Sequence, residues 1–222
     1  MTPRDQKVTR RQSPRALAAQ VFHGSVPIGC CEVASADPSQ LFPEERAAIG
    51  RAIIPRQQEF TAGRIAAREA MGSDILIPMA TDRAPIWPAG FAGSITHAGG
   101  WALAVAGHHD RLLGIDLELD DALPHEVFDT VLSQSERAWL REQPEPEVWA
   151  RVIFSAKECA YKAQYPRTLQ LFGFEVFEVS INPAAGEFSA RFQRDIAPFR
   201  AGDALNGRFS RGDGFILCGI VA

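Results

Sequence analysis

The chain has 222 residues and a formal net charge of -4, with 46% hydrophobic and 23% charged residues. This composition is typical of a folded globular protein with one large domain or two small lobes. The acidic balance argues against the broad basic surface that binds nucleic acid, but a local basic pocket can still bind a small anion. We therefore expect small anions as partners, and no nucleic acid.

The N-terminal stretch from Met1 to Arg15 is basic and polar, and no apolar signal-peptide core follows it. We expect residues 1–20 to form a flexible tail, residues 21–110 an N-terminal α+β lobe, and residues 111–222 a C-terminal α+β lobe. No stretch approaches the roughly 20 apolar residues of a membrane span, so the sequence predicts a cytoplasmic protein with no membrane association. The four cysteines lack the paired spacing of zinc sites and are expected to be reduced structural thiols.

Two sequence elements recur along the chain. The pattern Leu-x-x-x-Glu-Arg-Ala begins at Leu41 and again at Leu132, and Phe60–Arg68 aligns without gaps on Phe154–Lys162. Small or apolar side chains at three- and four-residue spacing predict that the second element is a helix in both copies. The chain is therefore expected to contain two similar lobes, unless the match of common alanines and arginines is a coincidence.

The aligned helices differ in charge. In the alignment, Arg64 of the first copy corresponds to Glu158 of the second, which suggests an anion site in one lobe and a cation site in the other. Gly72, directly after Met71, is a typical stop for the first helix.

Apolar runs predict strands between these helices. They lie at residues 101–106, 113–119, 174–181 and 215–221. The sequence thus predicts a mixed α+β fold with a lobe boundary near residues 107–113.

Two carboxylates stand out on the second of these strands. Successive side chains of a strand point to opposite faces, so Asp116 and Glu118 should share one face, with Cα atoms about 6–7 Å apart. Such a pair can hold one hard divalent cation, and Mg²⁺ and Mn²⁺ both favour oxygen ligands. Taken alone, the pair has an ordinary alternative, namely solvated acids on a half-exposed edge strand.

Two further elements carry candidate side chains. Lys157, Glu158 and Lys162 belong to the second predicted helix, where Glu158 and Lys162 lie one turn apart. His97 ends the segment Gly-Ser-Ile-Thr-His in front of the strand that begins at Trp101. Each has a common structural interpretation, as a surface ion pair and as a histidine satisfied by the backbone, so only the combination is informative.

Taken in order, three motifs resemble the phosphopantetheinyl transferase family. They are Gly-Ser-x-Thr-His at 93–97, Gly-Ile-Asp-x-Glu at 114–118 and Phe-Ser-x-Lys-Glu-x-x-x-Lys at 154–162. The resemblance spans about residues 40–165 and is greatest to the monomeric, two-lobed branch that contains the surfactin-type enzymes and enterobactin synthase component D. Phe154 replaces a frequent tryptophan and Cys159 a serine or alanine, and neither change removes a charged group.

The resemblance implies an α+β fold of two lobes in pseudo-twofold arrangement, with the active site between them. It implies an enzyme that transfers the 4'-phosphopantetheine group of coenzyme A to a serine of an apo acyl or peptidyl carrier protein, which leaves adenosine 3',5'-bisphosphate. The implied Mg²⁺ ligands, with Mn²⁺ as an alternative, are Asp116, Glu118 and Glu158. Glu158 is also the implied base, directly or through water, with Lys162 assisting. The residues implied to bind coenzyme A are Arg56, Arg64, Arg83, Ser94, His97, Asp116, Lys157 and Lys162.

The carrier is specified less closely. Residues 121–132 are implied to meet it, although Phe128 and Leu132 are more readily explained as core. The branch suggests siderophore or other nonribosomal peptide synthesis, while fatty-acid and polyketide carriers stay open. Two rival functions are a metal-dependent phosphohydrolase or nuclease, which the missing basic track disfavours, and a non-catalytic nucleotide-binding protein, which the complete set of acids disfavours.

Overall fold

The computed structural model describes residues 12–222, and the first eleven residues of the expected tail lie outside the described residues. The α-helices are α1 (Arg15–Phe22), α2 (Pro43–Ile49), α3 (Ile54–Met71), α4 (Phe128–Val131), α5 (Gln134–Leu140) and α6 (Pro146–Thr168). Short 3-10 helices are η1 (Val33–Ser35), η2 (Pro38–Gln40), η3 (His125–Val127) and η4 (Phe174–Val176). The strands are β1 (Ile28–Glu32), β2 (Phe91–Ala98), β3 (Trp101–His108), β4 (Leu113–Leu119), β5 (Phe177–Asn182), β6 (Glu187–Phe192), β7 (Ala204–Gly212) and β8 (Phe215–Val221).

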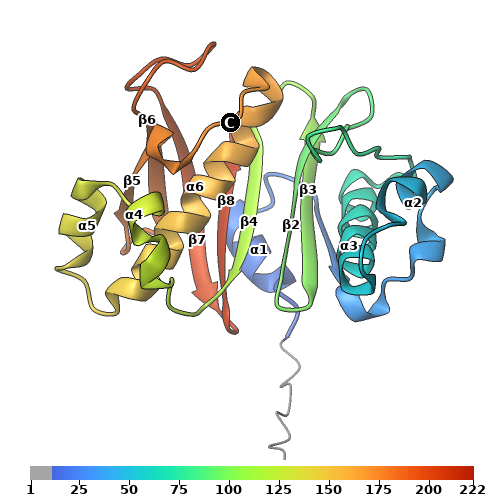
Figure 1. The fold of residues 1–222 in the computed structure, drawn as a ribbon, viewed down its shortest axis with the longest axis horizontal. Coiled ribbons are helices and arrows are strands. Elements are labelled where there is room, and N and C mark those ends of the chain that lie inside the picture. Colours follow the sequence, from blue (N-terminus) through green and yellow to red (C-terminus); the bar gives the residue numbers. More distant parts are fainter. Residues whose placement is uncertain (1–11) are drawn as a thin grey trace, which may run out of the picture.

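These elements form two lobes side by side (Figure 1). The first lobe holds an antiparallel sheet in the order β1-β3-β2, and the second holds an antiparallel sheet in the order β4-β8-β7-β6-β5. Helix α3 packs on the first sheet and α6 on the second. The predicted α+β fold of two similar lobes is confirmed.

The repeated Glu-Arg-Ala elements have the same structural role in both lobes. Glu45 accepts the backbone N–H of Phe42 at its own helix start and the guanidinium of Arg68 at 3.0 Å. Glu136 accepts the backbone N–H of Ser133 and the ammonium of Lys157 at 2.9 Å. Each glutamate therefore caps a short helix and ties it to the long helix of its lobe.

Glycines allow each long helix to lie close to its sheet. A Cβ at Gly29 of β1 would lie 1.8 Å from the carbonyl oxygen of Ala66 in α3, and one at Gly114 of β4 would lie 2.3 Å from that of Cys159 in α6. The two glycines thus meet equivalent helix positions at Ala66 and Cys159. The gap-free sequence alignment instead pairs Ala66 with Ala160, so the two registers differ by one residue. Arg64 therefore corresponds to Lys157 and not to Glu158, so the contrast of charge expected from the alignment is wrong.

Gly114 also sets the distance between α6 and the acidic strand. We expect Gly114→Ala to push the helix away from β4, because the added methyl meets backbone that cannot rotate aside, and to destabilise the fold by about 1–3 kcal/mol or more. Urea unfolding should show this loss, and Gly212→Ala, whose Cβ makes only an ordinary 3.4 Å contact with Leu17, is the control. Equal stability of the two variants would contradict the close-approach argument.

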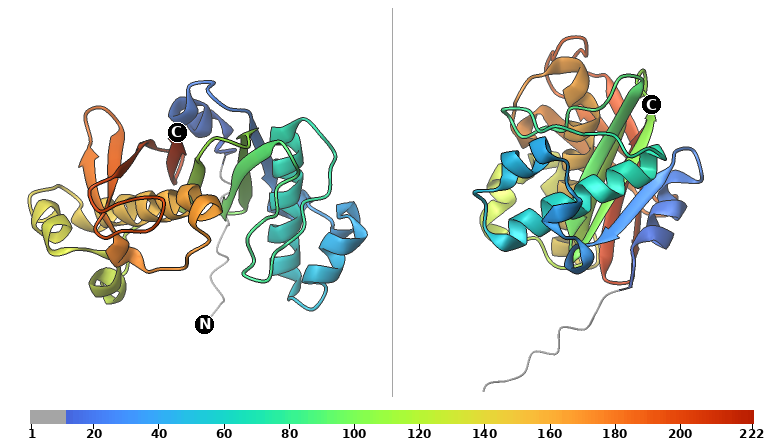
Figure 2. Two further views of the ribbon diagram at one scale, coloured as in Figure 1. Left: turned by 90° about the horizontal axis from the view of Figure 1, so that it is seen from above. Right: turned by 90° about the vertical axis from the view of Figure 1, so that its right-hand side faces the viewer.

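Helix α1 corrects the expected tail. Its Leu17, Ala18, Val21 and Phe22 are buried, and the helix packs mainly on β7 and β8, on the side of the sheet away from α6 (Figure 2). The flexible tail cannot extend to residue 20, and the first helix packs on the sheet of the second lobe. The apolar spacing at 17, 18, 21 and 22 is typical of an amphipathic helix, but the basic residues before it obscured this pattern.

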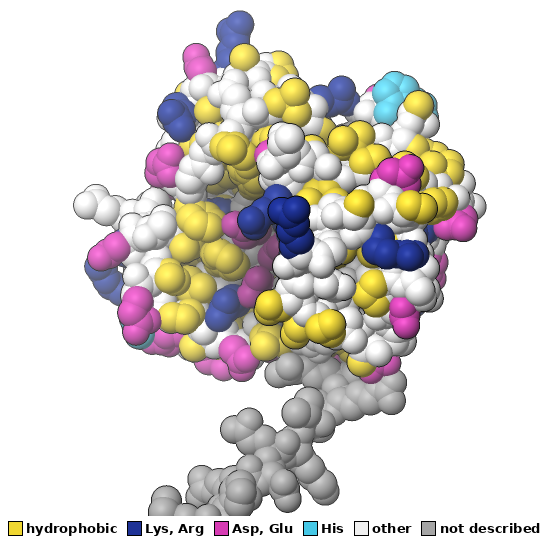
Figure 3. All heavy atoms as spheres, turned by 45° about the vertical axis from the view of Figure 1, so that its right-hand side comes forward, with side chains coloured by type: hydrophobic (Ala, Val, Ile, Leu, Met, Phe, Trp, Pro, Cys, Tyr) yellow, Lys and Arg dark blue, Asp and Glu magenta, His cyan; other side chains and the backbone are white. Residues whose placement is uncertain are grey.

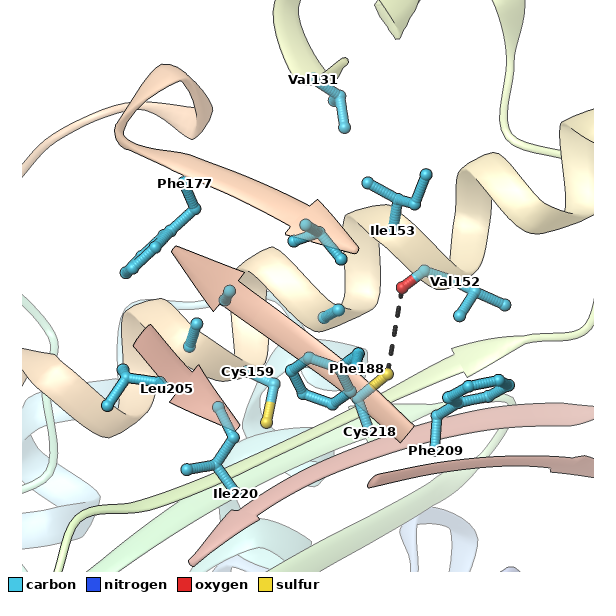
Figure 4. Packing of buried hydrophobic residues seen from close by; sticks show 14 of the residues in the cluster. Val131, Val152, Ile153, Cys159, Phe177, Phe188, Leu205, Phe209, Cys218 and Ile220 are labelled. Atoms are coloured by element: carbon cyan, nitrogen blue, oxygen red, sulfur yellow. Dashed lines mark hydrogen bonds between the residues drawn. The ribbon is translucent and has the colours of Figure 1, made fainter. Parts of the chain in front are cut away.

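The larger core lies between α6 and the five-stranded sheet (Figure 4). Cys159 and Cys218 are fully buried there among aliphatic and aromatic side chains, and the four cysteines of the chain are free thiols, as expected. Leu132 is buried and Phe128 packs against the same core, which confirms the structural reading of both. The predicted strands at 113–119 and 215–221 match β4 and β8, whereas residues 174–176 form a 3-10 helix.

The two sheets meet along β2 and β4 through side chains. Ser94 Oγ accepts the backbone N–H of Ile115 at 3.1 Å, and Thr96 Oγ1 accepts that of Leu117 at 3.0 Å. These hydroxyls stand in for the carbonyls of a regular ladder, so they satisfy N–H groups of β4 that would otherwise be buried without a partner. The Ser and Thr of the first motif thus fix the acidic strand against the first lobe.

Candidate active site

The acidic side chains of β4 lie in a cleft between the lobes. Asp116 and Glu118 share one face, as predicted, and line a cavity of about 270 Å³ together with residues of α3, β2 and α6. Figure 3 shows acidic side chains along a groove, with Lys and Arg at its rim and hydrophobic side chains on one wall. The cleft therefore combines negative and positive groups in a partly enclosed space.

Helix α6 supplies a cation to each acid. Asp116 Oδ1 accepts Lys162 Nζ at 2.6 Å, and its other oxygen accepts the Ser155 hydroxyl at 2.8 Å. Glu118 Oε2 accepts Arg151 Nη1 at 3.1 Å. Residues 151, 155, 158 and 162 follow one stripe of the helix, because they are spaced by three or four residues.

Glu158 lies on the same stripe between these two pairs. It makes neither a hydrogen bond nor an ion pair with any residue from 12 to 222. Burial raises the pKa of the Glu158 carboxyl, the Asp116 charge raises it further, and Lys162 opposes both. A half-buried acid with no partner of its own is suited to accept a proton or to bind a cation.

The charges of the cluster also shift its other members. Burial and the neighbouring Asp116 raise the pKa of Glu118 to about 7, although Arg151 and Lys162 lower it. Burial by itself would lower the pKa of Lys162, but the Asp116 carboxylate beside it leaves that pKa raised. Lys162 therefore stays cationic at neutral pH, while the acids carry an excess of negative charge that an added cation would relieve.

The opposite wall of the cleft carries basic groups. Arg56 at the start of α3 places Nη1 2.9 Å from Nε2 of His97, the next-to-last residue of β2. Arg83 lines the same cleft from the segment between α3 and β2, where its backbone has a positive φ of 73°. The structure brings Arg56, Arg83 and His97 together with the acids, as the sequence predicted.

Two of the residues implied to bind coenzyme A, Lys157 and Ser94, make structural hydrogen bonds. Lys157 is buried, and its Nζ donates to Glu136 and to the backbone carbonyls of Val131 and Phe174. These three bonds tie Lys157 to the core of the second lobe. Ser94 is buried and holds β4, as described above.

Arg64 is an intermediate case. Its Nε donates to the carbonyl of Ile77 at 2.8 Å, and its guanidinium lies 4.2 Å from the centroid of the Phe60 ring. Burial lowers its pKa to about 10. Arg64 lines the cleft, but its guanidinium also bonds the backbone carbonyl of Ile77. A substitution should therefore lower the stability of the fold as well as the affinity for an anion.

Sequence reasoning missed Arg151 and Ser155 as members of the site. Ser155 was part of the third motif, and Arg151 lies one helical turn before it. Extending the stripe from Lys162 and Glu158 toward the start of the helix, by three residues to 155 and then by four to 151, would have found both. Their partners on β4 could not be read from that spacing.

Arg151 also holds the turn that follows the acidic strand. Besides Glu118, its guanidinium donates to the carbonyls of Asp121 and Ala122. We expect Arg151→Met to lower kcat by about tenfold, in the range found when a residue supporting a functional ligand is lost, and to leave the KM for coenzyme A close to wild type.

A matched control distinguishes an effect on Glu118 from general loosening of this turn. Arg211→Met removes a comparable bond, from Arg211 Nε to Asp120 at 3.0 Å, without touching Glu118. Steady-state kinetics should show the loss of kcat only in Arg151→Met. The same loss in both variants would contradict a specific role for Arg151.

The carboxylate oxygens of Asp116, Glu118 and Glu158 are the type of ligand that a hard divalent cation prefers, and together they carry excess negative charge. Within residues 12–222, however, no group of three or more His, Cys, Asp or Glu side chains is assembled as a metal site. Asp116 and Glu118 instead face their cations on α6. The site therefore offers ligand atoms of the right chemical kind for a metal ion, but Asp116 and Glu118 are bonded to Lys162 and Arg151.

Comparison with known proteins identifies the class to which this fold and site belong. Residues 44–107 match the 4'-phosphopantetheinyl transferase N-terminal domain, and residues 112–206 match the 4'-phosphopantetheinyl transferase superfamily. The chain belongs to the 4'-phosphopantetheinyl transferase family and is an enzyme of that type, with coenzyme A as substrate. This membership decides against the phosphohydrolase, nuclease and binding-only alternatives.

Individual relatives support the same class. The chain is 40% identical to 4'-phosphopantetheinyl transferase Svp of Streptomyces mobaraensis, over 83% of this chain and 80% of the relative. It is 37% identical to 4'-phosphopantetheinyl transferase PptT of Mycobacterium tuberculosis, over 83% and 88%. Enterobactin synthase component D of Salmonella typhimurium is 36% identical over 56% of this chain and 55% of its own length. The branch suggested by the motifs is thereby confirmed.

From residue 12 onward, no helix is both long and apolar enough to cross a bilayer.

Proposed function

We propose that this enzyme transfers 4'-phosphopantetheine from coenzyme A to a serine of an apo peptidyl carrier protein in nonribosomal peptide synthesis, such as siderophore assembly. The observation that carries the proposal is the position of Glu158. It is a half-buried acid without a partner in the described chain, between the Asp116–Lys162 and Glu118–Arg151 pairs. Acyl carriers of fatty-acid and polyketide synthesis are the second candidates.

Glu158 is our candidate for the general base. The attacking nucleophile is the serine hydroxyl of the carrier, so the enzyme has only to accept its proton, directly or through one water. The raised pKa of Glu158, caused first by burial, makes it a better acceptor than an ordinary carboxylate. As the new bond from serine oxygen to phosphorus forms, the pyrophosphate P–O bond breaks and adenosine 3',5'-bisphosphate leaves with the electron pair.

The cations of the cleft are suited to hold the phosphates. Arg56, Arg83 and His97 line the wall opposite Lys162, so a phosphate chain between them would meet donors on both sides. Charge-assisted bonds of this kind both position the phosphates and offset the charge that develops on the leaving group. Lys162, which stays cationic, is the candidate for contact with the transferred phosphoryl group.

Asp116, Glu118 and Glu158 are the residues that would hold Mg²⁺, or Mn²⁺ in its place. The ion would supply Lewis-acid stabilisation of the pyrophosphate oxygens. Glu118 would have to exchange Arg151 for the ion, at least in part, and Asp116 would have to share its oxygens with Lys162.

Both acidic and basic walls of the cleft come from one chain, which supports a monomeric enzyme. The kind of carrier is supported by the relative named for enterobactin synthase. Residues 121–132 begin with the turn that Arg151 holds, and this position beside the acids is suited to contact the carrier.

The intact mass of an apo peptidyl carrier protein, incubated with the enzyme, coenzyme A and Mg²⁺, tests the proposal. We expect a gain of one phosphopantetheine and none when the metal is chelated. An apo acyl carrier protein is the matched second substrate. Modification of the acyl carrier alone would overturn the assignment to peptide synthesis, and modification independent of metal would overturn the role of the acids as ligands.

A further inference from the structure

Three titratable or charged side chains meet on the wall of the cleft opposite α6. Arg56 Nη1 lies 2.9 Å from His97 Nε2 and 3.2 Å from Glu59 Oε2, and that same carboxylate oxygen lies 3.9 Å from His97 Nε2. The side chains of Arg56, Glu59 and His97 are 44%, 34% and 38% exposed. A ligand in the cleft can therefore reach all three.

The bond between Arg56 and His97 defines the protonation of the imidazole. A guanidinium has only donors, so Nε2 of His97 must accept this hydrogen bond. An imidazole that accepts at Nε2 is neutral and carries its proton on Nδ1. In keeping with this, burial lowers the pKa of His97, and Arg56 lowers it further, while Glu59 raises it.

We propose that binding of a coenzyme A phosphate at Arg56 is coupled to the uptake of one proton by His97, with Glu59 as the positioning residue that stabilises the resulting imidazolium. The inference rests on the function proposed above. A phosphate accepts hydrogen bonds and cannot donate one in its dianionic form. When Arg56 turns its N–H groups to the phosphate, the lone pair of His97 Nε2 faces an anion unless a proton from solvent occupies it.

The other charged groups around His97 allow this change. Lys162 on α6 opposes the imidazolium, whereas Asp116 on β4 and Glu59 on α3 favour it. Arg83 lines the same cleft from the loop before β2 and adds to the opposition. A bound phosphate places new negative charge between these cations and His97, which shifts the balance toward the protonated ring.

The direction of proton exchange on binding distinguishes protonation of His97 from titration of the bound phosphate. Because the pKa of His97 is higher in the complex than in the free enzyme, affinity is greatest at low pH and falls as the pH rises through the pKa of the complex. A phosphate monoester, with a second pKa of about 6, can only lose a proton when it meets cations. Net uptake assigned to His97 therefore cannot come from the phosphate.

Nitrogen NMR of the imidazole rings tests the proposal on the full chain with metal chelated. The chain has five histidines, and loss of one signal set in His97→Asn assigns this residue. At a pH above the ordinary histidine pKa, we expect a neutral ring with the proton on Nδ1 in the free enzyme and both nitrogens protonated with saturating coenzyme A. Glu59→Gln should lower the protonated fraction in the complex, while His108→Asn, at the exposed end of β3, should leave it unchanged.

Two ligands distinguish the phosphates that could cause the effect. Protonation by adenosine 3',5'-bisphosphate but not by dephospho-coenzyme A would assign it to the 3'-phosphate, and the reverse would assign it to the pyrophosphate. A neutral His97 in an enzyme whose other signals show bound coenzyme A would overturn the coupling but leave the proposed function intact. Failure of coenzyme A to shift any signal, both with metal chelated and with saturating Mg²⁺, would overturn both.

Discussion

Glu118→Gln should lower kcat for carrier modification by about 100-fold or more, since it removes a charged oxygen donor from the acidic cluster rather than a supporting contact. The amide retains the size of the carboxylate and can still accept the bond from Arg151 Nη1. The loss would therefore report the missing charge and not a rearranged turn. Initial rates of holo-carrier formation measure it, and direct titration of Mn²⁺ into the enzyme should show weaker binding.

The stability of the same variant provides the control. Burial is the main cause that raises the folded-state pKa of Glu118 to about 7. Ionising this side chain therefore destabilises the folded protein as the pH rises from the pKa of Glu118 in the unfolded chain to its pKa in the folded one. Glu118→Gln removes this cost. Its Tm relative to wild type should therefore be higher at pH 8 than at pH 5 without metal. Near-normal turnover, or unchanged Mn²⁺ binding, would overturn the assignment of Glu118 as a ligand.

Lys157→Met should destabilise the fold by about 3–5 kcal/mol, because it leaves the buried carboxylate of Glu136 without its cation. Both side chains are 1% exposed, so water cannot replace the lost ammonium. Glu136 also accepts the backbone N–H groups of Ser133 and Val179, and it therefore cannot turn away from the site. Urea unfolding followed by circular dichroism measures the change.

Two further variants sharpen this result. Lys157→Met combined with Glu136→Gln should recover part of the stability, since the unpaired charge is then removed. Lys162→Met, on the same helix but 28% exposed beside Asp116, should cost less stability and more activity. If Lys157→Met kept wild-type stability and weakened coenzyme A binding, the role that the family resemblance implied for Lys157 would be restored.

The repeat shows how far local sequence can be read. The glutamates at 45 and 136 have matching roles because the same short pattern forms the same capped helix in each lobe. The gap-free alignment of the long helices, in contrast, is off by one residue. The register depends on where a glycine of a strand meets the helix backbone, and that contact joins residues distant in sequence.

The membership of the family, the α+β class and the shared face of Asp116 and Glu118 follow from sequence, because motif order and strand alternation are local properties. The helical stripe that carries Glu158 and Lys162 follows for the same reason. Local patterns also placed β4 and β8 at their observed bounds, since β4 alternates apolar residues with Asp116 and Glu118 and the buried β8 is a nearly continuous apolar run.

Only the tertiary structure decided which charged groups meet. Lys157 and Glu158 are adjacent in sequence, yet a helix turns by 100° between them, so Lys157 bonds the buried Glu136 while Glu158 lies near Asp116 and Lys162. Whether Arg151 pairs with Glu118, or Ser94 with the N–H of Ile115, depends on how closely α6 and β2 approach β4. That approach is set by the packing of whole elements against one another, and no local pattern contains it.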